Sequence, residues 1–231
     1  MIGFPLLLKA AEPLSPVVFL EGETITYDIK KLGIKFGEAA LNFKGKVTRG
    51  KDEVLLVTFT ARALNFLDDE KIFVNPKTFY PQVVERNLNL WGKKERITEE
   101  YFQEKGELKI TKEAGGKMTA RVINKKGPMD NLYCFIYRFR NSGEFKDGNF
   151  FTMELPTREV RIEIKGKASI KTAAHEFDAY LLESKDPEYK IWFDTSQSKI
   201  PLRIDGAVGL GNVSLVMSED TKDDGRRMKD D

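Results

Sequence analysis

The residues of this 231-residue chain best suited to chemistry lie in "KTAAHEFDAYLLES", residues 171–184. This segment holds the chain's only histidine, His175, followed by Glu176 and Asp178. An imidazole beside two carboxylates could act as a general base or as part of a metal site. The question is whether the three side chains form such a site or belong to a turn.

The residues after His175 alternate in the way that a strand does. Phe177, Ala179 and Leu181 fall on one face, which predicts a buried face, and the residues between them fall on the other. His175 precedes this strand, in a short gap after the preceding one. Histidine tolerates the backbone of a tight turn better than β-branched residues do, though less well than glycine. We therefore interpret His175 as a turn residue.

Other catalytic constellations are weak in this sequence. Glu99 with Glu100, and Asp68 with Asp69, could supply an acid and a base, but a chain with 36 acidic residues produces such pairs by chance. There is no nucleophile elbow, P-loop, zinc-protease motif or EF-hand loop. One histidine and one cysteine, Cys134, exclude a multi-histidine or cysteine-based metal centre. The sequence predicts no catalytic residue, no metal site and no cofactor.

Composition indicates a globular chain without a strong electrostatic field. Lys and Arg total 38 against 36 Asp and Glu, a net charge of +2, which gives no sign of a nucleic-acid partner. Residues 1–21 are expected to be a lead-in or the remnant of an export signal, and no stretch is long enough for a transmembrane span. Residues 22–217 are expected to form a single domain, and residues 218–231 a disordered charged tail.

Half-buried strands are the dominant pattern from residue 23 onward. Apolar and polar residues alternate with period two in about 12 or more short segments, and turns such as "RGKD", "EKGE" and "EAGGK" separate them. Close spacing of this kind is typical of antiparallel strands rather than of βαβ units. The predicted fold is all-β and predominantly antiparallel, a curved sheet or a partly open β-barrel.

One segment near residues 130–140 has the period of a helix instead. Its apolar stripe, with spacing i, i+3, i+4 and i+7, consists of Leu132, Phe135, Ile136 and Phe139. Asp130 is a suitable N-cap and Gly143 a suitable stop. Tyr133, Tyr137 and Arg138 lie off the stripe, so we expect them either on an amphipathic rim or facing a groove. The sequence therefore predicts one short helix that packs on the sheet.

Aromatic residues are abundant, with 16 Phe, 7 Tyr and 2 Trp. In a sheet of this size they either fill the core or line a concave face that suits an apolar ligand. The candidate ligand contacts are Tyr27, Trp91, Tyr101, Tyr137, Arg138 and Trp192. Stacking on single-stranded nucleic acid would need a basic groove, which the near-neutral charge does not indicate.

Several segments together resemble a bacterial family, domain of unknown function 3108. They are "GETITYDIKKLGIKFGEAAL", "DNLYCFIYRFR", "IKTAAHEFDAYLLE", "IWFDTSQSKIPLRIDG" and "GNVSLVM". The resemblance implies a mainly β, barrel-like envelope protein exported to the periplasm of a Gram-negative bacterium, with no established activity. Relatives often carry glycine at the position of His175, which agrees with a turn.

Three functional hypotheses follow. The first is a non-enzymatic periplasmic or envelope protein that binds a lipid-like or other apolar ligand in its concave face. The second is a structural or assembly module of the envelope, in which strand edges or the helix bind partner proteins. The third is an acid–base hydrolase that uses Glu176, Asp178 or His175, which requires these side chains to converge in a pocket.

Overall fold

Fourteen antiparallel strands and one α-helix make up the described part of the chain, which covers residues 19–142, 144–172, 175–185, 189–206 and 213–219 of a computed structural model. The first eight strands are β1 (Thr24–Lys31), β2 (Ile34–Arg49), β3 (Asp52–Ala63), β4 (Phe66–Val74), β5 (Pro81–Leu90), β6 (Lys93–Phe102), β7 (Glu107–Ala114) and β8 (Lys117–Asn124). The others are β9 (Phe150–Leu155), β10 (Arg158–Lys171), β11 (Glu176–Ser184), β12 (Lys190–Asp194), β13 (Pro201–Asp205) and β14 (Ser214–Met217). The helix α1 is Leu132–Ser142, and a short 3-10 turn, η1, is Gln103–Lys105.

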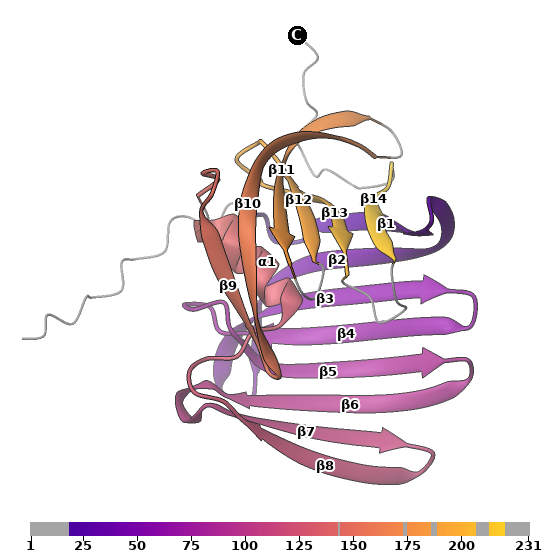
Figure 1. Ribbon diagram of the computed structural model, residues 1–231. Helices are drawn as coiled ribbons and strands as arrows, with labels where there is room; N and C mark the ends of the chain where they lie inside the picture. The colour runs from indigo at the N-terminus through magenta and orange to yellow at the C-terminus, as the bar shows by residue number, and fades with distance from the viewer. Residues whose placement is uncertain (1–18, 143, 173–174, 186–188, 207–212, 220–231) are drawn as a thin grey trace, which may run out of the picture.

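The strands form one continuous curved sheet, which confirms the predicted all-β antiparallel fold. Its order is β8-β7-β6-β5-β4-β3-β2-β1-β14-β13-β12-β11-β10-β9. The first strand meets the last in the middle of the sheet, with Tyr27 of β1 opposite Met217 of β14. The sheet curls towards a barrel (Figure 1). The barrel stays open because its edge strands, β8 and β9, do not pair with each other.

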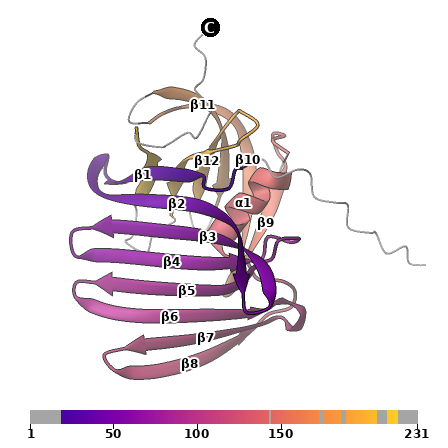
Figure 2. The same ribbon diagram turned by 180° about the vertical axis from the view of Figure 1, so that it is seen from behind.

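The helix α1 lies on the concave side of this sheet, between its two arms, β1–β8 and β9–β14 (Figures 1 and 2). Tyr133 stacks on Phe59 of β3, with ring centroids 4.4 Å apart. Phe139 contacts Phe151 of β9 and Phe193 of β12, at 4.9 and 5.1 Å. Aromatic side chains from both arms thus pack against the helix, and the helix fills the concave side of the sheet between the two arms.

The predicted helix is confirmed, but two details of the prediction were wrong. Tyr133 and Tyr137 are buried rather than on a rim, because the sheet covers the helix from both sides. The N-cap is Asn131, whose Oδ1 accepts a hydrogen bond from the Tyr133 amide at 2.9 Å, and not Asp130. The predicted stop, Gly143, lies outside the described residues.

The burial of strand β11 also differs from the pattern of one buried and one exposed face that its alternation predicts. Phe177 and Ala179 do lie on a covered face, but they pack in a small separate cluster with Ile170 and Leu202. Tyr180 and Leu182, on the opposite face, pack against the main core. Because both faces of β11 are covered, the period of the apolar residues could not show which one faces α1.

Candidate functional site

Two of the predicted ligand contacts are core residues, Tyr27 on β1 and Tyr137 on α1 itself. Tyr27 is buried, and its hydroxyl donates to the Pro201 carbonyl at 2.9 Å. Tyr137 is also buried, and its hydroxyl has no hydrogen-bond partner among the described residues. Burial raises the pKa of both phenols well above the usual range. Both side chains therefore pack in the core on the concave side of the sheet.

The three other aromatic candidates lie far from one another in the fold. Tyr101 is buried on β6 and donates to Glu99 Oε2 at 2.6 Å. Trp91 is exposed in the turn between β5 and β6. Trp192 is half-buried in the small cluster beside β11. The structure therefore does not bring the aromatic candidates together around one ligand.

Arg138, the last candidate, anchors the start of α1. Its guanidinium donates to both carboxylate oxygens of Asp130, each at 2.6 Å, and lies 4.3 Å from the centre of the Tyr80 ring. The buried Asp130 carboxylate also accepts the Glu154 amide of β9 at 3.3 Å. This arrangement joins the helix to β9 and to the β4–β5 connection, so Arg138 has a clear structural role.

A buried charged cluster occupies the concave face of β4–β6. Arg86 Nε and Nη2 donate to the two carboxylate oxygens of Asp68 at 2.7 and 2.5 Å, and Nε lies 3.4 Å from Glu70 Oε1. Burial raises the pKa of Glu70 to about 8, an effect that Arg86 opposes and that Asp68 and Glu99 increase. Glu70 is therefore largely protonated at neutral pH, and the Asp68–Arg86–Glu70 group carries little net charge.

This cluster was not predicted from the sequence, although the alternation of residues in β4 indicates it. Phe66, Ile72 and Val74 share one face of the strand and are all buried. Asp68 and Glu70 have the same parity, so the alternation places two carboxylates on the buried face. A buried carboxylate needs a partner or a proton, and Arg86 on the neighbouring strand supplies the partner.

The described residues of segment 171–184, around His175, form no catalytic or metal site. His175 is exposed in the β10–β11 turn, where its carbonyl accepts the Thr172 amide at 2.9 Å. Glu176 accepts a hydrogen bond from Ser169 at 2.5 Å, and Asp178 is exposed. In the part of the chain that the structure describes, no group of three or more His, Cys, Asp or Glu side chains could hold a metal ion.

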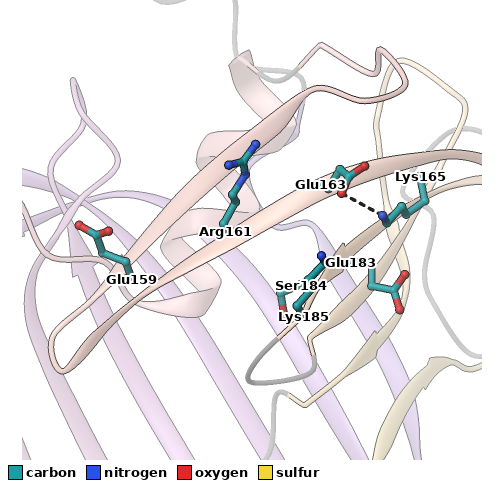
Figure 3. A pocket seen from close by; sticks show the side chains of 7 residues that line it. All are labelled: Glu159, Arg161, Glu163, Lys165, Glu183, Ser184 and Lys185. Carbon is teal, nitrogen blue, oxygen red and sulfur yellow. Dashed lines mark hydrogen bonds and ion pairs between the residues drawn. The ribbon is translucent and has the colours of Figure 1, made fainter.

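A surface hollow of about 800 Å³ lies over β10 and β11 (Figure 3). It is lined by Glu159, Arg161, Glu163, Lys165, Glu183, Ser184 and Lys185. Three acidic and three basic side chains balance one another, and Lys165 pairs with Glu163 at 2.8 Å. This hollow has no charge preference and no converging catalytic pair.

The sheet edge at β8 is open, and this is its most distinctive feature for binding. All of its residues except the half-buried Ile123 are exposed, and its pairing with β7 runs without a bulge from Asn124 to Lys117. The other edge, β9, is partly covered. Lys125 donates to Glu154 and to the Leu155 carbonyl, at 2.6 and 3.1 Å. Among the described residues, β8 thus offers the one long, regular and uncovered strand edge.

These features define a β-barrel-like protein built on an open sheet with a helix inside. Among the described residues, no helix has the length and apolar character needed to cross a membrane. The chain belongs to the DUF3108 family, described as "Protein of unknown function", whose profile matches residues 24–218.

The chain is also similar to a protein of known crystal structure. It is a β-barrel-like protein of the domain of unknown function DUF1849 from Brucella abortus, with a TM-score of 0.49 and 10% sequence identity. The similarity covers 86% of this chain and 95% of that one. No curated protein sequence matches this chain significantly.

Proposed function

We propose that this protein is a non-enzymatic assembly module of the cell envelope that binds a partner protein by adding a strand to β8. The open edge carries this proposal, because its outward N–H and C=O groups can pair with an extended segment. Native edge strands are usually short, bulged, interrupted by proline or covered. β8 has eight residues, an unbroken register and no proline.

The chemistry of β8 favours an acidic, extended segment as the occupant. Lys117 and Arg121 are exposed on one face, and neither forms an ion pair with a described residue. Met118 and Val122 are exposed on the other face. The strand contains no acidic residue, so a partner segment with alternating carboxylates and apolar side chains fits both faces.

A lipid-like ligand in the concave face is the second candidate function. The supporting observation is an apolar strip on β5 and β6, at the margin of the core cluster that includes Tyr101. Leu88 and Ile97 are half-buried there, and Leu90 is exposed. Arg86 borders this strip with part of its guanidinium accessible. Native mass spectrometry of protein purified from its own envelope tests this candidate, and absence of any lipid adduct counts against it.

The proposed location is the periplasm or cell envelope, as the family resemblance of the sequence implies. Cell fractionation with a tagged full-length chain tests it directly. Recovery in the periplasmic or membrane fraction agrees with the proposal, whereas recovery only in the cytosol contradicts it.

Site-specific photocrosslinking tests the strand-addition proposal. A photoreactive residue at Val122 should give a discrete adduct with a partner protein in intact envelopes. The same residue at Lys51, in the β2–β3 turn, is the control and should give none. Lys117→Glu with Arg121→Glu should abolish the Val122 adduct while the protein remains folded. Absence of an adduct at Val122, or an adduct only with a second copy of this chain, contradicts the proposal.

A further inference from the structure

Four hairpin turns lie at one end of the sheet and form a surface that we call the hairpin end. They connect β1 to β2, β3 to β4, β5 to β6 and β7 to β8, and Figure 1 shows the last three in a row at the right-hand end of the sheet, with the β1–β2 turn above them. Each turn has two residues: 32–33, 64–65, 91–92 and 115–116. Neighbouring turns are two strand spacings apart in the sheet, so their tips lie about 10 Å apart.

Three of the four tips present a large apolar side chain to solvent. Leu32 is 96% exposed, Leu64 83% and Trp91 70%. Further exposed apolar side chains near the same turns are Ile34, Phe36, Leu90 and Met118. One such side chain is common on a protein surface, but a row of them at one end indicates an interaction surface.

The backbone makes two of these tip residues unfavourable for the fold itself. Leu32 has φ +51° and Trp91 has φ +54°, both in the left-handed region. Glycine, asparagine and aspartate are preferred at this position of a two-residue hairpin turn. A bulky side chain there is strained and, at this exposure, gains no burial in return. The residue types at these tips therefore indicate a contact outside the protein.

The charges around the tips select the partner. In the four six-residue segments centred on the turns, 30–35, 62–67, 89–94 and 113–118, there are seven basic residues and one acidic residue, Glu113. The basic residues are Lys30, Lys31, Lys35, Arg62, Lys93, Lys94 and Lys117. Lys30 and Lys35 pair with Asp28, but the other five have no ion pair with any described residue. The whole chain carries only +2, so positive charge is concentrated at this end.

A shallow hollow lies between two of the tips. It has a volume of about 540 Å³ and is lined by Gly92, Lys93, Lys94, Glu95, Ala114 and Gly115. Lys93 and Lys94 are exposed beside it. Glu95 also lines the hollow and forms an ion pair with Lys112 at 2.6 Å, whereas Lys93 and Lys94, which directly follow the Trp91–Gly92 turn, form none with a described residue.

We propose that the hairpin end docks on an anionic lipid surface, with Leu32, Leu64 and Trp91 inserted among the headgroups. Tryptophan and leucine side chains favour the membrane interface, and unpaired lysines favour anionic lipid. An apolar row with basic flanks fits this surface better than a protein groove, which would need no excess of positive charge. The hairpin end shares Lys117 and Met118 with β8, but Leu32, Leu64, Trp91, Lys93 and Lys94 lie outside that strand, so the proposal does not depend on the partner-binding function.

Vesicle flotation with the full chain tests the proposal. The protein should bind vesicles of phosphatidylcholine with about 30% phosphatidylglycerol and not vesicles of phosphatidylcholine alone. Binding should weaken as salt rises from about 50 to about 300 mM. Leu32→Asn with Trp91→Asn should weaken binding about tenfold or more. Because asparagine suits the backbone at both positions, these variants should remain folded.

Charge variants and a matched control complete the experiment. Lys93→Gln with Lys94→Gln should weaken binding to the anionic vesicles about tenfold or more. Lys51→Gln, in the β2–β3 turn at the opposite end of the sheet, should leave it unchanged. Equal loss in the Lys51 variant would show a general charge effect and overturn the proposal.

Tryptophan fluorescence provides a readout for insertion itself. The chain has two tryptophans, so Trp192→Phe leaves Trp91 as the only source of tryptophan emission. Its emission should shift to shorter wavelength on addition of anionic vesicles and become protected from a soluble quencher. No vesicle binding, or binding without any shift of the Trp91 emission, overturns the proposal. Capture of a protein partner at Val122 would be unaffected by either result.

Discussion

Arg140 at the end of α1 forms a bidentate ion pair with Glu23 at the start of the sheet. Its Nη1 and Nη2 donate to the two carboxylate oxygens at 2.6 and 2.8 Å. Its Nε and Nη2 also donate to the Ser198 carbonyl, both at 3.0 Å. The guanidinium is fully buried, and the Phe19 and Tyr137 rings lie close to it. One side chain thus fixes the helix to β1 and to the β12–β13 connection.

Removal of Glu23 should therefore destabilise the protein strongly. Glu23→Ala leaves a buried guanidinium without its counter-ion, and we expect a loss of about 3–5 kcal/mol in the free energy of unfolding. The exposed pair of Lys46 and Glu53, 2.7 Å apart, is the control, and Glu53→Ala should have no measurable effect. Urea denaturation of both variants measures the difference, and equal stabilities would contradict a structural role for the Arg140 pair.

This ion pair also shows what the sequence could and could not predict. The alternation of strands and the helical stripe are local patterns, so they predicted the antiparallel sheet and the helix. The contact of Arg140 with Glu23 joins residues 117 positions apart, and no local pattern carries it. For the same reason, the burial of Tyr133 and Tyr137 depends on how far the sheet curls around the helix. The burial of Asp68 and Glu70, in contrast, follows from a local pattern. Both alternate along β4 with Ile72, so they share its buried face.

Stability should fall with rising pH because of Glu70. Its pKa is raised to about 8 in the folded protein, from about 4.5 in the unfolded chain. Between these values the unfolded chain loses this proton and the folded protein retains it, so the free energy of unfolding decreases. The contribution is complete below pH about 4.5 and lost as pH rises through about 8. Each pKa unit corresponds to at most about 1.4 kcal/mol.

The comparison of Glu70→Gln with the wild type measures this effect. The variant should lack this part of the pH dependence, so its stability relative to the wild type should increase from pH 5.5 to pH 8.5. Glu53→Gln, an exposed substitution, should follow the wild type at both values. Parallel stability curves for the Glu70 variant and the wild type would show that Glu70 is ionised in the folded state.

The N-cap of α1 should contribute to stability through one hydrogen bond. Asn131 Oδ1 accepts the Tyr133 amide at 2.9 Å. Asn131→Ala removes this acceptor and should cost about 1 kcal/mol, whereas Asn131→Asp retains an acceptor and should cost less. Thermal unfolding distinguishes the two variants. If both lower the melting temperature equally, the amide NH₂ of Asn131 matters rather than its capping oxygen.

Cys134 should be inert in the folded protein. It is fully buried on α1, and burial raises the pKa of its thiol well above the usual range, so almost no thiolate forms. Iodoacetamide should therefore react with Cys134 only as the protein unfolds. The rate of labelling in increasing urea should follow the unfolding equilibrium, and rapid labelling without denaturant would show that α1 leaves the concave face readily.

The tips of the hairpin end should be sites where stability and function oppose each other. Leu32→Asn and Trp91→Asn relieve the left-handed strain of bulky residues, and each should raise the free energy of unfolding by about 0.5–1 kcal/mol. Asn65 has φ +57° and already suits its position, so Asn65→Leu is the matched control and should be destabilising. Urea denaturation of the three variants tests this. Stabilised tip variants that also lose vesicle binding would mean that the fold tolerates strain at Leu32 and Trp91 for the sake of lipid contact.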